Sequence, residues 1–314
     1  MISKIKDLSN ASTLVVEAEG DDQRVDNFLF RHCRGVPRSH IYRILRTGQV
    51  RVNSGRVGAT HRLREGDRVR VPPIRIAAAK PGPAQAPPGP ELPLVYEDDA
   101  LLVIDKPAGV AVHGGSGISF GVIERMRAAR PKLKLLELVH RLDRDTSGLL
   151  MLAKKRSLLV RLHEALRAGE IDKRYLALVK GRWTQAERSV SLPLRKYVTG
   201  AGERRVSVDN EGKAAQTVFR LERRFRDFTL LSAELRSGRT HQIRVHLAHL
   251  GYPIAGDDKY GDFELNRALS ARGLKRMFLH AAELTLTHPA SGEVLRLTSP
   301  LPAALAQFLE QLEA

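Results

Sequence analysis

The 314-residue sequence is poor in cysteine and in long apolar runs. Its single cysteine, Cys33, excludes an internal disulfide and a zinc site built from cysteines. No apolar run approaches the roughly 18 residues that a membrane-spanning helix needs. The first residues also lack the apolar stretch of a signal peptide. We therefore expect a cytoplasmic protein with no membrane partner.

The patterns of common metal and phosphate sites are missing as well. His241, His246 and His249 lack the spacing of a metalloprotease helix. Residues 256–262 contain acids, but not the alternating ligands and closing glutamate of a calcium-binding EF-hand. The glycines near residue 115 are not followed by the lysine of a nucleotide-binding loop. We expect no metal and no cofactor.

Acidic residues are scarce relative to basic ones, and the formal net charge is +17. From Arg24 to Arg75 there are 13 arginines, no lysine and 3 acids, a net charge of +10. Arginine forms paired hydrogen bonds with phosphates and stacks on bases. This segment therefore points to a polyanionic partner, although charged helices are often only solvated surfaces.

The arginine-rich segment also has a pattern of short elements. Val25, Phe28, Leu29 and Cys33 recur at helical spacing, and a second helix is predicted between Pro37 and Gly48. Short alternating runs at residues 50–52 and 68–71 predict strands. The stretch 36–53 resembles an S4 RNA-binding domain. The resemblance implies RNA contacts for arginines on and after the second helix, namely Arg38, Arg43, Arg46 and Arg51.

Composition divides the chain into four parts. We expect a weakly ordered tail at residues 1–21 and the S4-like domain at residues 22–76. A linker rich in proline, glycine and alanine, residues 77–91, cannot supply a core. Residues 92–314 form a larger domain in which strands and helices mix without regular alternation, which indicates an α+β fold.

The stretch from Val139 to Gly148 combines an isolated acid, flanking arginines and a Thr-Ser-Gly turn. An apolar run follows, so Asp143 is expected where a loop meets a buried strand. Such an acid on its own is more often a turn or cap residue than a catalyst. Asp143 and Asp145 also do not predict the opposed carboxylates of a glycosidase.

The same stretch closely resembles the His-Arg-Leu-Asp-x-x-Thr-Ser-Gly signature of RNA pseudouridine synthases. The resemblance implies a mixed, mainly antiparallel sheet with flanking helices, and it implies isomerase activity on uridines in ribosomal RNA. It makes Asp143 the catalytic residue and Tyr175 the active-site tyrosine. Arg141 would replace the flipped base in the stack, and Arg244 would pair with Asp143. We expect a monomer.

The segment around Arg244 has a readable local structure. Residues 228–235 predict a strand, and Thr240 is a plausible cap for a helix that ends at Gly251. Thr240, Arg244 and Ala248 would then share one face, which lets the arginine point inward.

The chemistry implied by the resemblance suits these residue types. Breaking the N1–C1′ bond and joining C5 to C1′ needs no redox change. A carboxylate can attack or stabilise the sugar carbon or act as a base on the sugar, and an adjacent arginine keeps it ionised and aimed. A non-catalytic S4 protein that binds RNA during ribosome assembly is the rival hypothesis. The target uridines cannot be read from the sequence.

Overall fold

The computed structural model describes residues 10–33, 36–74, 90–114, 120–200 and 202–313. The chain divides into two compact units. One comprises Met1–Pro87 with Lys155–Val160, and the other comprises Pro88–Lys154 with Arg161–Ala314. Most of the linker predicted at 77–91, and the first nine residues of the predicted tail, lie outside the described residues. Within the described part, no helix is long and apolar enough to cross a membrane.

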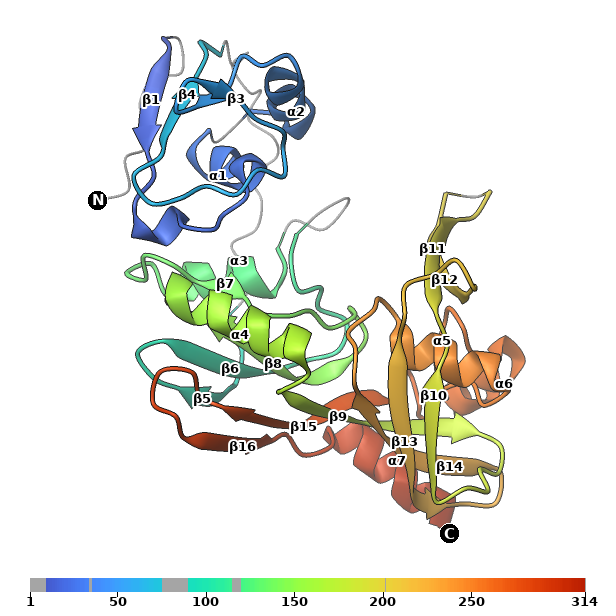
Figure 1. Ribbon diagram of the computed structural model, residues 1–314. Helices are drawn as coiled ribbons and strands as arrows, with labels where there is room; N and C mark the ends of the chain where they lie inside the picture. The colour runs from blue at the N-terminus through green and yellow to red at the C-terminus, as the bar shows by residue number, and fades with distance from the viewer. Residues whose placement is uncertain (1–9, 34–35, 75–89, 115–119, 201, 314) are drawn as a thin grey trace. The chain divides into compact units, whose positions relative to one another are not determined.

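The small unit is a four-stranded antiparallel sheet with two α-helices (Figure 1). The strand order is β1-β4-β2-β3. Its elements are β1 (Ser12–Val15), the 3-10 helix η1 (Ala18–Gly20), α1 (Val25–His32), α2 (Arg38–Arg46), β2 (Arg51–Val52), β3 (Gly55–Arg56) and β4 (Arg68–Val71).

Both helices of the small unit form where the apolar spacing predicts them. Their apolar faces pack into one core that includes Phe28, Leu29, Ile41 and Ile44. The second helix ends before Gly48, whose φ of +71° lies in the left-handed region that glycine adopts most easily.

The prediction of a weakly ordered tail up to residue 21 is wrong for its second half. β1 pairs with β4 along its whole length, from Ser12 opposite Val71 to Val15 opposite Arg68. Leu14 is buried in the core of the small unit. A strand of four residues gives only a weak local signal, and its stability comes from a partner more than 50 positions away in the sequence.

The large unit is built on a mixed, mainly antiparallel ten-stranded sheet, as predicted. The main path is β10-β13-β14-β9-β15-β8-β6-β5, with β16 beside β15 and β7 beside β8. Its strands are β5 (Leu94–Glu97), β6 (Leu101–Lys106), β7 (Glu137–Leu138), β8 (Ser147–Ala153), β9 (Asp172–Lys180), β10 (Glu187–Ser191), β13 (Gln216–Arg224), β14 (Phe228–Leu235), β15 (Leu279–Thr287) and β16 (Val294–Thr298).

Helices flank this sheet (Figure 1). They are α3 (Val122–Ala129), α4 (Arg156–Ala168), α5 (Gln242–His249), α6 (Phe263–Ala271) and α7 (Ala303–Glu313). A two-stranded hairpin, β11 (Leu194–Val198) with β12 (Arg204–Val208), projects from the unit. Among the strand pairs of the described residues, only β8 and β15 run parallel. This pairing brings the start of β8 next to β15 at the centre of the sheet.

Candidate active site

Asp143 lies in the loop between β7 and β8, where the sequence places it. The backbone amide of Thr146 donates to the Asp143 carbonyl at 3.3 Å and closes a turn. Gly148 follows with a φ of +105°, and a Cβ at this position would lie 2.2 Å from the carbonyl oxygen of Ala281 on β15. Because glycine has no Cβ, the backbone at Gly148 can pack directly against β15, and this contact fixes where the loop joins the sheet. The Asp143 side chain remains 17% exposed.

Arg244 reaches Asp143 from α5, but the helix begins differently from the prediction. Its N-cap is His241, in the left-handed region with a φ of 55°, and not Thr240. The preceding loop is held by Gln242, whose side-chain oxygen accepts from the Ser237 hydroxyl at 2.8 Å and the Arg239 amide at 3.0 Å. The Gln242 side chain thus holds the loop before the helix, and a cap by Thr240 does not set the first residue of the helix.

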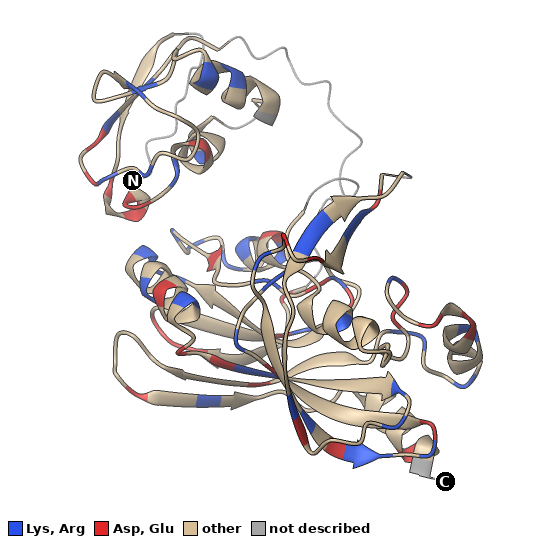
Figure 2. Ribbon diagram, turned by 45° about the vertical axis from the view of Figure 1, so that its right-hand side comes forward, with Lys and Arg blue, Asp and Glu red and all other residues tan. Residues whose placement is uncertain are grey.

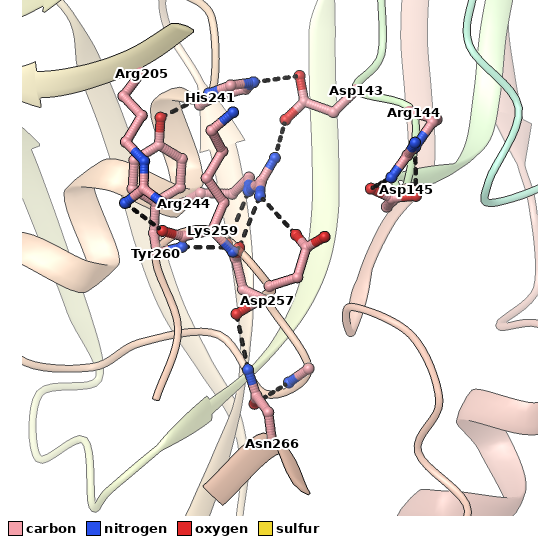
Figure 3. Close-up of polar contacts among 12 residues, drawn as sticks. Asp143, Arg144, Asp145, Arg205, His241, Arg244, Asp257, Lys259, Tyr260 and Asn266 are labelled. Carbon is pink, nitrogen blue, oxygen red and sulfur yellow. Dashed lines mark hydrogen bonds and ion pairs between the residues drawn. The ribbon is translucent and has the colours of Figure 1, made fainter. Parts of the chain in front are cut away.

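The guanidinium of Arg244 donates hydrogen bonds to two carboxylates (Figure 3), and a third, that of exposed Asp258, lies 3.7 Å from its Nη2. Its Nη1 donates to Asp143 Oδ2 at 3.0 Å. Its Nε and Nη2 donate to the two oxygens of Asp257 at 2.8 and 2.7 Å. Burial alone would lower the pKa of Arg244, but Asp257 and Asp143 raise it above its ordinary value. Burial would raise the pKa of Asp257, and the bonds from Arg244 bring it below its ordinary value.

The sequence did not identify Asp257 as a site residue, although it lies in the acidic loop that failed the calcium pattern. Its carboxylate also accepts from the amides of Lys259 at 2.8 Å and Tyr260 at 3.0 Å. Asn266 on α6 donates to the Asp257 carbonyl at 2.8 Å. This loop is therefore a fixed support for Arg244. The acid-rich composition of this loop, without a metal-binding pattern, is the signal that could have identified Asp257 from the sequence.

Tyr175 is buried on β9, opposite Ala233 of β14 and Ala281 of β15. With Asp143 and Arg244 it lines a cavity of about 420 Å³, within the roughly 300–1,000 Å³ usual for small-molecule sites. Burial, and to a lesser extent the charge of Asp143, raises the pKa of Tyr175. The phenol therefore keeps its proton at neutral pH.

Arg141 is exposed and lines this cavity. It also lines a second cavity of about 410 Å³ that Asp143 lines too, together with Arg144 and Lys259. The structure thus places the other three predicted active-site residues around the Asp143 carboxylate. Of these three, Tyr175 and Arg244 are buried, whereas Arg141 is exposed.

The predicted RNA-binding arginines belong to the small unit. Figure 2 marks the lysines and arginines of the chain in blue. Arg43, Arg46 and Arg51 are exposed. Arg51 donates to the Ser54 carbonyl at 3.1 Å, and Arg43 contacts the His40 ring at 3.2 Å. The side chain of Arg38 lies outside the described part of the chain.

Lys106 is another residue that the sequence did not single out. It is fully buried at the end of β6. Its Nζ donates to the carbonyls of Pro107 and Val110 at 2.8 Å and of Arg144 at 3.0 Å. The last of these bonds ties the loop after β6 to the loop that carries Asp143. Burial lowers the pKa of Lys106 to about 7, against the attraction of Asp145.

No group of three or more histidine, cysteine, aspartate or glutamate side chains gathers as a metal-binding cluster within the described ranges. The polar groups around Asp143 are instead satisfied by one another, through Arg244, Asp257 and the amides of the 256–262 loop.

Comparison with known proteins identifies the family of the chain. The family model described as RNA pseudouridylate synthase matches residues 100–249. Ribosomal large subunit pseudouridine synthase C of Yersinia pestis is 50% identical over 300 residues, covering 94% of each chain. The protein of the same name from Escherichia coli K12 is 50% identical over 306 residues, covering 95% of this chain and 96% of its own.

Among solved structures, human RNA Pseudouridylate Synthase Domain Containing 4 superposes with a TM-score of 0.58 at 25% identity. The match covers 70% of this chain and 93% of the human chain. Half of all positions are shared with curated relatives along almost the whole sequence, and the fold agrees independently. The chain therefore belongs to the RNA pseudouridine synthase family.

Proposed function

We propose that this RNA pseudouridine synthase isomerises uridines in the ribosomal RNA of the large subunit, with Asp143 as the catalytic residue. The names of the matching relatives support the substrate class, since they are ribosomal large subunit pseudouridine synthases of type C. The S4-like stretch and the residues 24–29 also resemble type C more than the related type D.

The observation that carries the proposal is the arrangement around Arg244. A buried, bidentate pair with Asp257 fixes the guanidinium, and its remaining nitrogen holds Asp143 at 3.0 Å. Asp143 is thereby aimed into a cavity that it shares with a buried tyrosine. A protein that only binds RNA has no need for a carboxylate held in this way.

In this reaction the N1–C1′ bond breaks, the uracil turns, and C5 joins C1′. C5 then loses its proton and N1 gains one, so no atom is lost or gained overall. Asp143 would act at the sugar, as a nucleophile or electrostatic partner at C1′ or as a base. Its Oδ2 is engaged by Arg244, so Oδ1 is the oxygen that faces the substrate. The cavity would exclude bulk water from the separated uracil and sugar, which favours rejoining over hydrolysis.

Tyr175 and Arg141 would serve the flipped nucleotide. A target base must leave its stack to reach an enclosed site, and an aromatic ring can receive it. Because Tyr175 stays a neutral phenol, its environment favours stacking over the role of a base at C5. Arg141, exposed at the rim, is placed to occupy the gap in the RNA stack.

We also propose that the S4-like domain at residues 22–76 provides affinity for rRNA, while the domain from residue 92 onward carries the reaction. The support is the excess of +10 between Arg24 and Arg75 and the exposure of Arg43, Arg46 and Arg51. Contacts to phosphates would hold the enzyme on its substrate without selecting the base.

The test is to map pseudouridines in the rRNA of cells with and without this protein, and then to add purified protein to the unmodified rRNA. We expect specific large-subunit positions to lose pseudouridine in its absence and to regain it in vitro. A rRNA-binding assembly protein would bind the same RNA and leave every uridine unchanged.

A further inference from the structure

His241 lies between the catalytic carboxylate and a second tyrosine (Figure 3). Its Nδ1 is 2.8 Å from the Tyr260 hydroxyl, and its Nε2 is 3.8 Å from Asp143 Oδ1. The side chain is only 16% exposed and lines both cavities next to Asp143. Its position as the left-handed N-cap of α5 fixes where the ring leaves the backbone.

The partners of Tyr260 determine which nitrogen of His241 carries the proton. The backbone amide of Val206, on β12, donates to the Tyr260 oxygen at 2.9 Å. Within the described residues, His241 Nδ1 is the one acceptor within reach of the proton of that hydroxyl. Because the hydroxyl already accepts from Val206, we assign its single proton to the bond with Nδ1. In a neutral imidazole the remaining proton must then be on Nε2.

The surroundings of His241 favour the neutral ring. Burial lowers the pKa of His241, and although Asp143 opposes this effect, Arg244 and Lys259 reinforce it. The Nε2–H group is therefore a hydrogen-bond donor, and Asp143 Oδ1, 3.8 Å away, is an acceptor. The hydrogen bond from Arg244 to Oδ2 keeps the carboxylate in this orientation.

A separation of 3.8 Å is too long for a direct hydrogen bond. One oxygen atom can nevertheless lie at hydrogen-bond distance from both groups. To satisfy them together it must accept from Nε2–H and donate to Oδ1, which a hydroxyl does and a carbonyl or phosphate oxygen does not. A water molecule also meets this requirement, but among the oxygen groups of an RNA nucleotide only the hydroxyl does.

We propose that His241 and Asp143 jointly bind the 2′-hydroxyl of the target ribose. This inference rests on the proposed function, because it takes uridine in RNA as the substrate. The 2′-oxygen is on the carbon next to C1′, so holding it against Oδ1 brings the carboxylate to the bond that breaks. The same contact distinguishes ribose from deoxyribose at the reacting nucleotide.

The test is a cycle of two changes, one in the enzyme and one in the RNA. Single-turnover rates are measured for wild type and His241→Ala on an rRNA fragment with uridine or 2′-deoxyuridine at the modified position. We expect the deoxy substrate to slow wild type by roughly 10- to 100-fold, and His241→Ala to slow the normal substrate by roughly 3- to 10-fold. On the deoxy substrate, the alanine variant should be no slower than wild type.

Two further variants and a control separate recognition from folding. His241→Gln places an amide nitrogen at the position of Nε2 and should recover most of the rate and the discrimination. Tyr260→Phe removes the proton donor that sets the tautomer and should weaken the discrimination. His249, exposed at the end of the same helix, gives the matched control, and His249→Ala should change neither quantity.

Equal slowing of both substrates by His241→Ala would overturn the inference, because the histidine would then act on something other than the 2′-oxygen. A wild-type enzyme indifferent to the 2′-hydroxyl would overturn it as well, as would a glutamine variant that behaves like alanine. Failure of wild type to form pseudouridine on any large-subunit rRNA would instead refute the proposed function.

Discussion

Arg244 donates hydrogen bonds to two carboxylates of very different burial. Asp257 is 1% exposed and takes two of its hydrogen bonds, whereas Asp143 is 17% exposed and takes one. The buried pair with Asp257 anchors the guanidinium. The remaining nitrogen, Nη1, then positions the partly exposed carboxylate of Asp143. This division lets one arginine serve both the stability of the fold and the orientation of the reacting group.

Asp143→Asn keeps the size and much of the hydrogen bonding of the side chain but removes its charge. We expect pseudouridine formation to stop, because the amide can neither act as a nucleophile or base nor stabilise positive charge at the sugar. Folding and RNA affinity should survive, since the side chain is at the cavity surface. Rates near wild type in purified Asp143→Asn would show that another group performs the reaction.

Arg244→Ala should lower both activity and stability, because it leaves Asp257 buried without its partner. Removing one member of a buried pair typically costs about 3–5 kcal/mol. Arg244→Lys should recover only part of either loss, because an ammonium cannot bridge both carboxylates with the same geometry. Thermal unfolding and single-turnover assays measure the two effects. Unchanged melting of the alanine variant would contradict the anchoring role of the pair.

Close packing at Gly148 decides how the catalytic loop joins the sheet. Gly148→Ala would meet the Ala281 carbonyl and also force a left-handed residue, with φ near +105°. The control is Gly273→Ala, where φ is +101° but nothing lies within 4 Å of the added Cβ. We expect the control to lose about 1–2 kcal/mol from strain alone, and Gly148→Ala to lose about 2–5 kcal/mol. Equal losses in denaturant unfolding would show that the close approach has no energetic role.

Buried Lys106 links the loop after β6 to the Asp143 loop. Because burial lowers its pKa, we expect the stability of the folded protein to depend on pH. With its pKa lowered to about 7 from the ordinary 10.5, the folded lysine is neutral between these values and keeps two N–H donors for the three carbonyls, while the unfolded one is protonated. Unfolding then takes up a proton, so stability rises with pH across this window.

In wild type, this proton raises the free energy of unfolding by at most about 1.4 kcal/mol per pH unit. Lys106→Met has no such proton and should not show the rise. It should also be less stable overall, because three carbonyls lose their donor. Chemical unfolding of both proteins from pH 7 to about 10.5 makes the comparison. Parallel stability curves would mean that the buried lysine stays charged in the folded protein.

On the scale of the whole molecule, basic charge and reaction chemistry occupy different parts of the chain. Most of the excess charge lies in the arginine-rich segment of the small unit, whereas Asp143 and its partners belong to the large unit. If the small unit binds the rRNA as proposed, this separation allows RNA affinity to change without changing the geometry of the site.

The double substitution Arg43→Ala and Arg46→Ala should weaken binding to rRNA and flatten its salt dependence. Removing one arginine–phosphate contact changes the log-log slope by roughly 0.7–0.9. Arg267→Ala, on an exposed position of α6, is the control and should leave the slope unchanged. Identical slopes for wild type and the double variant would indicate that the two arginines are only solvated surface.

Patterns that are local in the sequence were sufficient for much of this protein. The turn before an apolar run located Asp143, helical spacing located α1 and α2, and the strand Phe228–Leu235 was predicted with its observed bounds. These features follow from the periodicity of helices and strands and from turn chemistry, which act over a few residues. The family signature is equally local, and so the reaction class was readable from the chain.

The remaining features depended on contacts between distant segments. Asp143 and Arg244 are 101 positions apart, and the supports of the site come from Asp257, from His241 and from the Tyr260 hydroxyl held by β12. None of these residues belongs to a periodic pattern that marks its role. Strand order brings them together, and burial then determines which charges pair and which nitrogen of His241 carries a proton. The sequence by itself predicted which residue acts, and the tertiary structure decided how that residue is held.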